Sequence, residues 1–175
     1  MSFVKTKQIV PYTQGASVTV DTTASETTLL SSTGSVGGLL LLKNDFTVGK
    51  TYRVSGCGVF SNTGTPTLTV KVKLGSTDVL STGAITTVTG ASNREFSFSG
   101  LITVKSLGGS GTVNGQGIFV ETLATGVSLN YPMTNASAVT VDTTANQTVN
   151  VTAQWSASSA SNTITLTNFV LEELN

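Results

Sequence analysis

A seven-residue repeat places two aspartates in the same local sequence. Val18-Thr-Val-Asp-Thr-Thr-Ala24 recurs as Val139-Thr-Val-Asp-Thr-Thr-Ala145. Two carboxylates that share one proton can activate water for peptide hydrolysis. That chemistry needs a tight loop with glycine after the Asp-Thr pair, and both copies carry β-branched Thr there. We therefore expect Asp21 and Asp142 to end strands, with side chains that bond amides of the next turn.

Four further carboxylates are candidates for the acid pair that hydrolyses a glycosidic bond, namely Asp45, Asp78, Glu95 and Glu121. All four fall at expected turn edges or strand ends, where solvated carboxylates are ordinary. Serine is abundant, but the chain has no His that could activate it. We therefore predict that the protein is not an enzyme.

Neither the glycine-rich runs nor the single cysteine predicts a cofactor site. Gly34–Gly38 and Gly108–Gly111 do not lead into a helix followed by Lys-Ser/Thr, so we interpret them as hairpin turns rather than phosphate loops. Cys57 is alone, which rules out an intrachain disulfide, and no Cys/His cluster is present for a metal. We expect Cys57 to be a small packed residue rather than a reactive thiol, and no cofactor or metal.

Four aromatic residues could form a sugar-binding platform, because exposed rings stack on sugars: Tyr12, Tyr52, Tyr131 and Trp155. Trp155 is in phase with the valines and alanine that precede it, which instead predicts burial in a core.

The composition favours β-structure, and it favours a role in binding over one in catalysis. Of the 175 residues, 53 are Thr or Ser, and Thr suits a pleated, half-solvated surface. The nine basic and nine acidic residues cancel, so no basic face is expected for nucleic acid. The chain has no long apolar run, and we expect neither a signal peptide nor a membrane partner.

Period-two alternation predicts the elements that must position these groups. In Thr67–Leu74 aliphatic residues alternate with Thr and Lys. Glu95–Lys105 alternates likewise, and we expect a bend or bulge at Gly100. The remaining strands are predicted at Phe3–Val10, Ser17–Val20, Thr27–Leu30, Leu39–Leu42, Thr51–Phe60, Thr77–Leu80, Gly111–Glu121, Ala138–Val141, Val149–Trp155 and Ile164–Leu171.

These strands, separated by turn formers and without helical periodicity, predict an all-β fold. We expect a two-sheet antiparallel β-sandwich, most simply a jelly roll. Residues 1–175 form a single domain in this interpretation, with 1–15 as an N-terminal arm or edge strand. Ala124–Asn135 is expected to be a long loop.

Several phrases of the sequence carry a family resemblance. They include Phe46-Thr-Val-Gly-Lys-Thr-Tyr-Arg-Val-Ser-Gly56, Gly64-Thr-Pro-Thr-Leu-Thr-Val-Lys-Val-Lys-Leu-Gly75, Ser92-Asn-Arg-Glu-Phe-Ser-Phe98, Gly111-Thr-Val-Asn-Gly-Gln-Gly117 and Gln154-Trp-Ser-Ala-Ser-Ser-Ala-Ser-Asn-Thr-Ile-Thr-Leu166. The chain resembles small jelly-roll virion proteins of tailed bacteriophages, which decorate capsids or form head fibres and tail appendages. These are strand and turn phrases, so no functional residue is carried over.

The resemblance implies a non-enzymatic structural protein of the virion, assembled in the host cytoplasm. A capsid decoration or cement protein is the first hypothesis, and a receptor- or glycan-binding module of a tail or head fibre is the alternative. The implied partners are other copies of the chain, as a homotrimer, and the major capsid protein or other virion proteins.

Two parts of the chain are candidates for subunit contact. Gly37–Leu42 has aliphatic residues on both faces of a strand, which fits either a subunit interface or a strand buried inside the monomer. Lys5 and Lys7 near one end, and Glu172 and Glu173 near the other, could pair within or between subunits or remain solvated.

Overall fold

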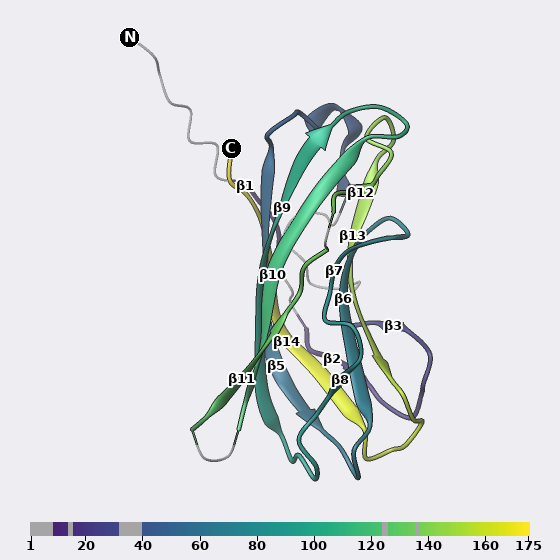
Figure 1. The fold of residues 1–175 in the computed structure, drawn as a ribbon, viewed down its shortest axis with the longest axis vertical. Coiled ribbons are helices and arrows are strands. Elements are labelled where there is room, and N and C mark those ends of the chain that lie inside the picture. Colours follow the sequence, from purple (N-terminus) through teal and green to yellow (C-terminus); the bar gives the residue numbers. More distant parts are fainter. Residues whose placement is uncertain (1–8, 14–15, 32–39, 124–125, 136) are drawn as a thin grey trace.

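The computed structural model describes residues 9–13, 16–31, 40–123, 126–135 and 137–175, and for 9–13 only the backbone. Within that part, the chain forms two antiparallel sheets packed face to face (Figure 1). The predicted all-β, two-sheet antiparallel sandwich is therefore confirmed. The one described helix is a 3-10 turn, η1 (Lys43–Asp45). A helix long and apolar enough to cross a membrane does not occur among the described residues.

The larger sheet has the strand order β1-β14-β5-β9-β10-β11, and β2 also pairs with β14 and β12 with β10. Its strands are β1 (Ile9–Thr13), β2 (Val18–Val20), β5 (Thr51–Ser61), β9 (Arg94–Ser106), β10 (Thr112–Thr122), β11 (Ser128–Pro132), β12 (Val139–Thr140) and β14 (Thr163–Glu173). β1 lies at one edge of this sheet, so part of the segment predicted as an arm or edge strand is paired with β14.

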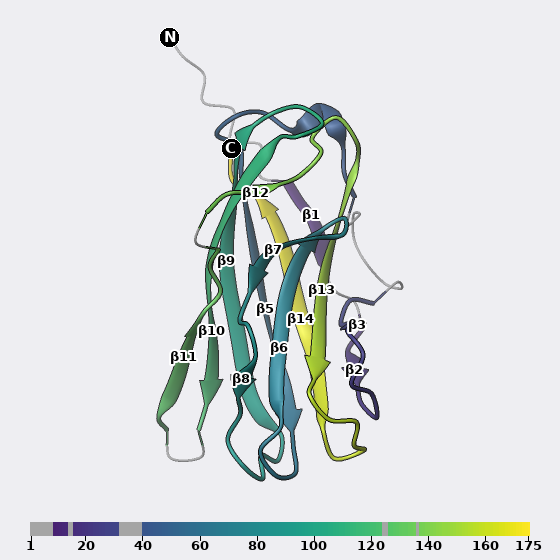
Figure 2. The same ribbon diagram turned by 45° about the vertical axis from the view of Figure 1, so that its right-hand side comes forward.

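The smaller sheet has the order β3-β13-β6-β7, and β4 also pairs with β13 and β8 with β6. Its strands are β3 (Thr27–Thr28), β4 (Leu40–Leu41), β6 (Thr67–Leu74), β7 (Thr77–Ser81), β8 (Ile85–Thr86) and β13 (Gln147–Trp155). Figure 2 shows β6, β7, β8 and β13 as a layer in front of β5, β9 and β14.

Strand pairing is nested along the chain. The early strand β2 pairs with the last strand, β14, while β3 and β4 pair with β13. Inside these pairs, β5 pairs with β9 and β6 pairs with β7. The members of each pair lie in one sheet, and the chain changes sheets between one pair and the next.

Alternating sequence becomes alternating burial, as predicted. On β6, Leu68, Val70, Val72 and Leu74 are all buried, while the Thr and Lys residues between them lie on the outer face. On β9, the aromatic and aliphatic residues in phase with Phe96 are also buried. The core therefore lies between the two sheets. Its largest fully buried side chains include Trp155, Tyr52, Phe60, Phe119 and Phe169.

Of the bend or bulge expected at Gly100, the bulge does not form. β9 keeps an unbroken register with β5 through this residue, and Gly100 occupies an inward position. A Cβ there would lie only 2.5 Å from Leu80 Cδ1 of the smaller sheet. A side chain at this position would require Leu80 to shift, so the glycine lets Leu80 pack directly onto β9.

The region predicted as a long loop, Ala124–Asn135, contains β11, so that prediction is also wrong. β11 pairs only with β10 at an edge of the larger sheet, and four of its five residues are exposed. An exposed edge strand needs no apolar alternation, which is why the pattern did not reveal it. The short strand β8 was missed as well.

Candidate interaction surface

The repeated aspartates do not form a catalytic pair. Asp21 follows β2 and Asp142 follows β12, and Figure 1 shows these two strands toward opposite ends of the sandwich. The Asp142 carboxylate accepts hydrogen bonds from the Thr144 hydroxyl at 2.6 Å and the Thr144 amide at 2.8 Å, and these bonds lower the pKa of Asp142. The predicted turn role is confirmed for Asp142. At Asp21 the bond comes from the neighbouring Thr22 hydroxyl instead.

The other carboxylate candidates lie in unlike environments. Asp45 lies in η1, and Asp78 takes part in ion pairs on the outer face of the smaller sheet. Glu95 is exposed on the outer face of β9. Glu121, expected to be a solvated residue at a strand end, is instead fully buried.

Glu121 holds a loop in place. Its carboxylate accepts hydrogen bonds from the Val88 amide at 3.3 Å and from the Tyr131 hydroxyl at 3.3 Å. Burial raises the pKa of Tyr131, and the Glu121 charge raises it further. These contacts tie the segment after β8 to the β10–β11 hairpin. β10 carries Glu121 inward in the same alternation that buries Phe119, so the sequence held a signal for this position.

No sugar platform arises from the described aromatic side chains. Trp155 is fully buried, which confirms its predicted core position, and Tyr52 is 1% exposed. Tyr131 is half-buried, and its ring packs 6.3 Å from the ring of Phe119. Tyr12 lies where only the backbone is described.

The remaining sequence candidates are structural where they are described. Gly108–Gly111 forms the predicted hairpin turn between β9 and β10, closed by the Gly111 amide on the Gly108 carbonyl at 2.9 Å. Gly34–Gly38 lies outside the described residues. The described residues contain no group of three His, Cys, Asp or Glu side chains arranged to hold a metal.

The segment expected at a subunit contact has two different sides. Leu41 is buried in the core, whereas Leu40 and Leu42 are each 48% exposed. Residues 37–39 lie outside the described part of the chain. Near the other end, Glu172 pairs with Arg53 at 3.4 Å, and Glu173 pairs with Lys50.

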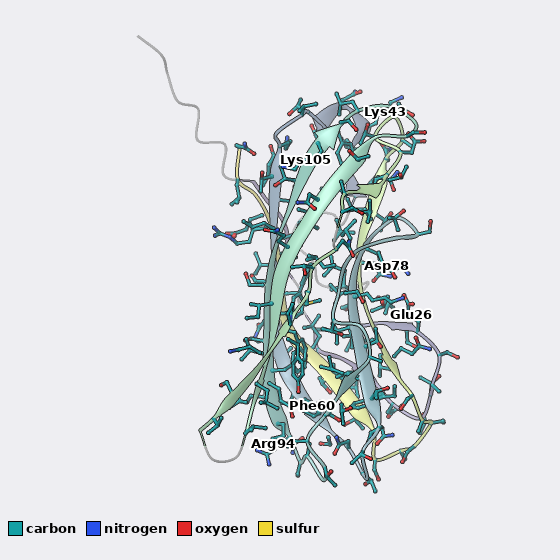
Figure 3. The ribbon with its side chains drawn as sticks, viewed as in Figure 1. Glu26, Lys43, Phe60, Asp78, Arg94 and Lys105 are labelled. Carbon is teal, nitrogen blue, oxygen red and sulfur yellow. The ribbon has the colours of Figure 1, made fainter. Side chains whose placement is uncertain are left out.

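The outer face of the smaller sheet carries a closed network of charges. Lys71 and Lys73 each contact both Glu26 and Asp78, with N–O distances of 2.8 to 2.9 Å. The Thr152 hydroxyl donates a further bond to Glu26 at 2.9 Å. Figure 3 shows Glu26 and Asp78 on this outer side, with Phe60 between the sheets.

The network controls the ionisation of its members. Burial alone would raise the pKa of Glu26, but hydrogen bonds from Lys73, Lys71 and Thr152 outweigh it and lower the pKa from 4.5 to about 2. The pKa values of Lys71 and Lys73 are raised, mainly by hydrogen bonds to Asp78. All four groups are thus charged and mutually paired at neutral pH.

The outer face of the larger sheet carries an apolar groove. A cavity of about 350 Å³ has a floor of small residues from β5 and β9, including Ser55 and Ser99. Ile118 and Val120 of β10 form one wall and Val170 of β14 forms the other. In the cross-strand row Ile118–Ser99–Ser55–Val170, two small side chains lie between two branched ones. This difference in size makes the surface concave.

A second cavity of about 330 Å³ continues the groove along the strands. Both cavities are lined by Cys57 and Ser97, and the second extends to Glu95 near the lower end of β9. Figure 3 shows the neighbouring Arg94 at that end of the molecule. We call the two cavities together the outer groove.

A bulge in β14 shapes the same groove. The register with β5 slips between Leu166 and Asn168, so Thr167 is the extra residue, and its hydroxyl bonds the Cys57 carbonyl at 2.9 Å. Bulges re-aim side chains at functional edges and sites. Cys57 itself faces outward because it is in phase with Ser55 and Val59 on β5, so this half-buried residue lines the groove rather than the core.

Comparisons of the chain with protein-family models, with curated proteins and with solved structures find no match.

Proposed function

We propose that the protein is a non-enzymatic structural protein of a tailed-bacteriophage virion. It acts as a capsid decoration or cement protein, assembles in the host cytoplasm and binds neighbouring subunits. Its partners are other copies of itself, as a homotrimer, and the major capsid protein or another virion protein.

The observation that carries this proposal is the outer groove. Its lining combines small residues with aliphatic and aromatic ones and a few neutral polar groups, and Glu95 at one end is its one charged side chain. Cores of protein–protein interfaces are similarly depleted of charge and shaped to accept a partner. On the other face, the charge network would be costly to bury.

The nested strand pairing supports the jelly-roll form of the sandwich. A long antiparallel hairpin that wraps into two sheets pairs its first strand with its last and its innermost strands with each other. Jelly rolls recur in viral capsid domains. In this assignment β10 and β11 extend the larger sheet beyond the wrapped strands.

Purified particles of the phage that encodes this chain provide the test. Mass spectrometry of the particles should detect the protein, and particles made without it should bind the purified protein and carry it through a density gradient. A variant with arginine in the groove, Ser97→Arg, should cosediment less than the unaltered protein. Absence of the protein from purified particles would overturn the proposal.

A further inference from the structure

We propose that the outer groove binds residues 1–8 of a second copy of this chain. The proposal deepens the proposed function, on which it rests, because it names the segment that joins neighbouring copies. Residues 1–8 lie outside the described part of the chain and enter here by sequence alone.

The groove changes in character from its upper to its lower end. Its upper part lies between Ile118 and Val170 and presents mainly apolar surface. Its lower end carries Glu95, an exposed carboxylate with no cationic partner among the described residues. An occupant that is apolar at one end and basic at the other would match both parts.

The N-terminal segment has that composition in that order. Phe3 and Val4 are followed by Lys5 and Lys7, and the first twenty residues contain no acidic residue. Phe3 and Lys7 are four residues apart, as are Ser99 and Glu95 on the groove floor. Four extended residues cover about 13 Å in both cases. Phe3 can therefore lie beside Ser99 while Lys7 reaches Glu95.

The position of β1 shows which copy supplies the segment. Ile9 pairs with Glu173, which lies in the row of Tyr52 and Ile102, above the apolar part of the groove. A segment that enters its own groove from Ile9 would place its lysines at the top and Phe3 below them, the reverse of what the groove offers. A second copy whose chain enters beside Glu95 satisfies the order.

This contact uses two different surfaces, the segment before β1 on one copy and the outer face of the larger sheet on the next. Such head-to-tail contacts close into rings when the rotation between copies allows it. The homotrimer of the proposed function would be a closed ring of three such contacts.

A cross-link in the full-length chain tests the inference directly. In a chain with Phe3→Cys, Ser99→Cys and Cys57→Ser, mild oxidation should join the thiol at position 3 to the thiol at position 99 of another copy, giving covalent multimers on a non-reducing gel. The matched control combines Phe3→Cys with Cys57→Ser and Thr69→Cys, which moves the acceptor thiol to the outer face of the smaller sheet. It should remain monomeric on the gel.

A charge exchange tests the lower end of the groove. Glu95→Lys should weaken self-association by about tenfold, because a like charge then faces the lysines. Adding Lys5→Glu and Lys7→Glu to the same chain should restore it. Asp45→Lys, at an exposed carboxylate in η1 remote from the groove, is the control and should change nothing. Sedimentation velocity measures the association, and circular dichroism verifies folding.

An intramolecular disulfide, equal cross-linking in the control, or no cross-link would each overturn the inference. Particles that contain the protein while the cross-link fails would leave the proposed function in place and remove only this contact. If the cross-link forms but the protein is absent from purified particles, the contact between copies stands and the proposed function is overturned.

Discussion

The outer faces of the two sheets use their polar groups in different ways. On the smaller sheet, Lys71 and Lys73 are paired with Glu26 and Asp78, so these charges need no partner from another molecule. On the larger sheet, small residues such as Ser97 leave an open groove with aliphatic walls. Both faces belong to alternating strands, so alternation defines an outer face without defining its use. Whether an outer face is closed by ion pairs or left open as a groove depends on which side chains lie next to one another on neighbouring strands.

The largest expected effect concerns the packing beneath the groove. A Cβ on Gly58 would overlap the Thr165 carbonyl oxygen of β14, so Gly58→Ala must push β5 and β14 apart. We expect a loss of about 3 kcal/mol of unfolding free energy, measured by denaturant titration. Gly109→Ala is the control, because nothing lies within 4 Å of its added Cβ. Equal stability of both variants would show that the β14 bulge is not rigid.

The next effect separates the two faces by function. Ser97→Arg places a long charged side chain in the groove and should weaken self-association by about tenfold. Thr69→Arg makes the same change on the outer face of the smaller sheet and should leave association unaltered. Sedimentation velocity of both variants gives the comparison. A similar loss in both would mean that the groove has no special part in assembly.

A smaller effect is expected from opening the charge network. Glu26→Gln removes the acceptor shared by Lys71, Lys73 and Thr152. Because the network is partly exposed, we expect a loss of only about 1 kcal/mol of unfolding free energy at neutral pH. Thermal melts with and without high salt should show the loss shrink as salt screens the pairs. We expect the self-association of Glu26→Gln to be unchanged.

The smallest effect is the acid dependence of that difference. The folded-state pKa of Glu26 is about 2, below its usual 4.5. A depressed carboxyl pKa contributes stability that is present above about pH 4.5 and is lost as pH falls toward 2. The stability gap between the unaltered protein and Glu26→Gln should therefore close across this window. A gap that persists at pH 2 would contradict the role of ionised Glu26.

Much of the framework was predictable, because burial follows a period of two along each strand. The inward side of β6, the core position of Trp155 and the turn role of Asp142 all follow from local sequence. β11 and the burial of Glu121 were missed for opposite reasons. An exposed edge strand has no pattern to detect, whereas the alternation of β10 placed Glu121 on the inner face but its charge led to the expectation of a solvated residue.

Local sequence was sufficient for the fold class, since alternation and turn residues act over a few positions and each strand carries its own signal. It also excluded hydrolysis by a Ser-His-Asp triad, because the chain contains no His. The outer groove and the charge network needed the folded chain. Glu26 meets Lys71 across 45 positions, and Ser55 meets Ser99 only through the register of β5 with β9. Contacts between strands distant in sequence depend on pairing and register, which no short stretch of residues encodes.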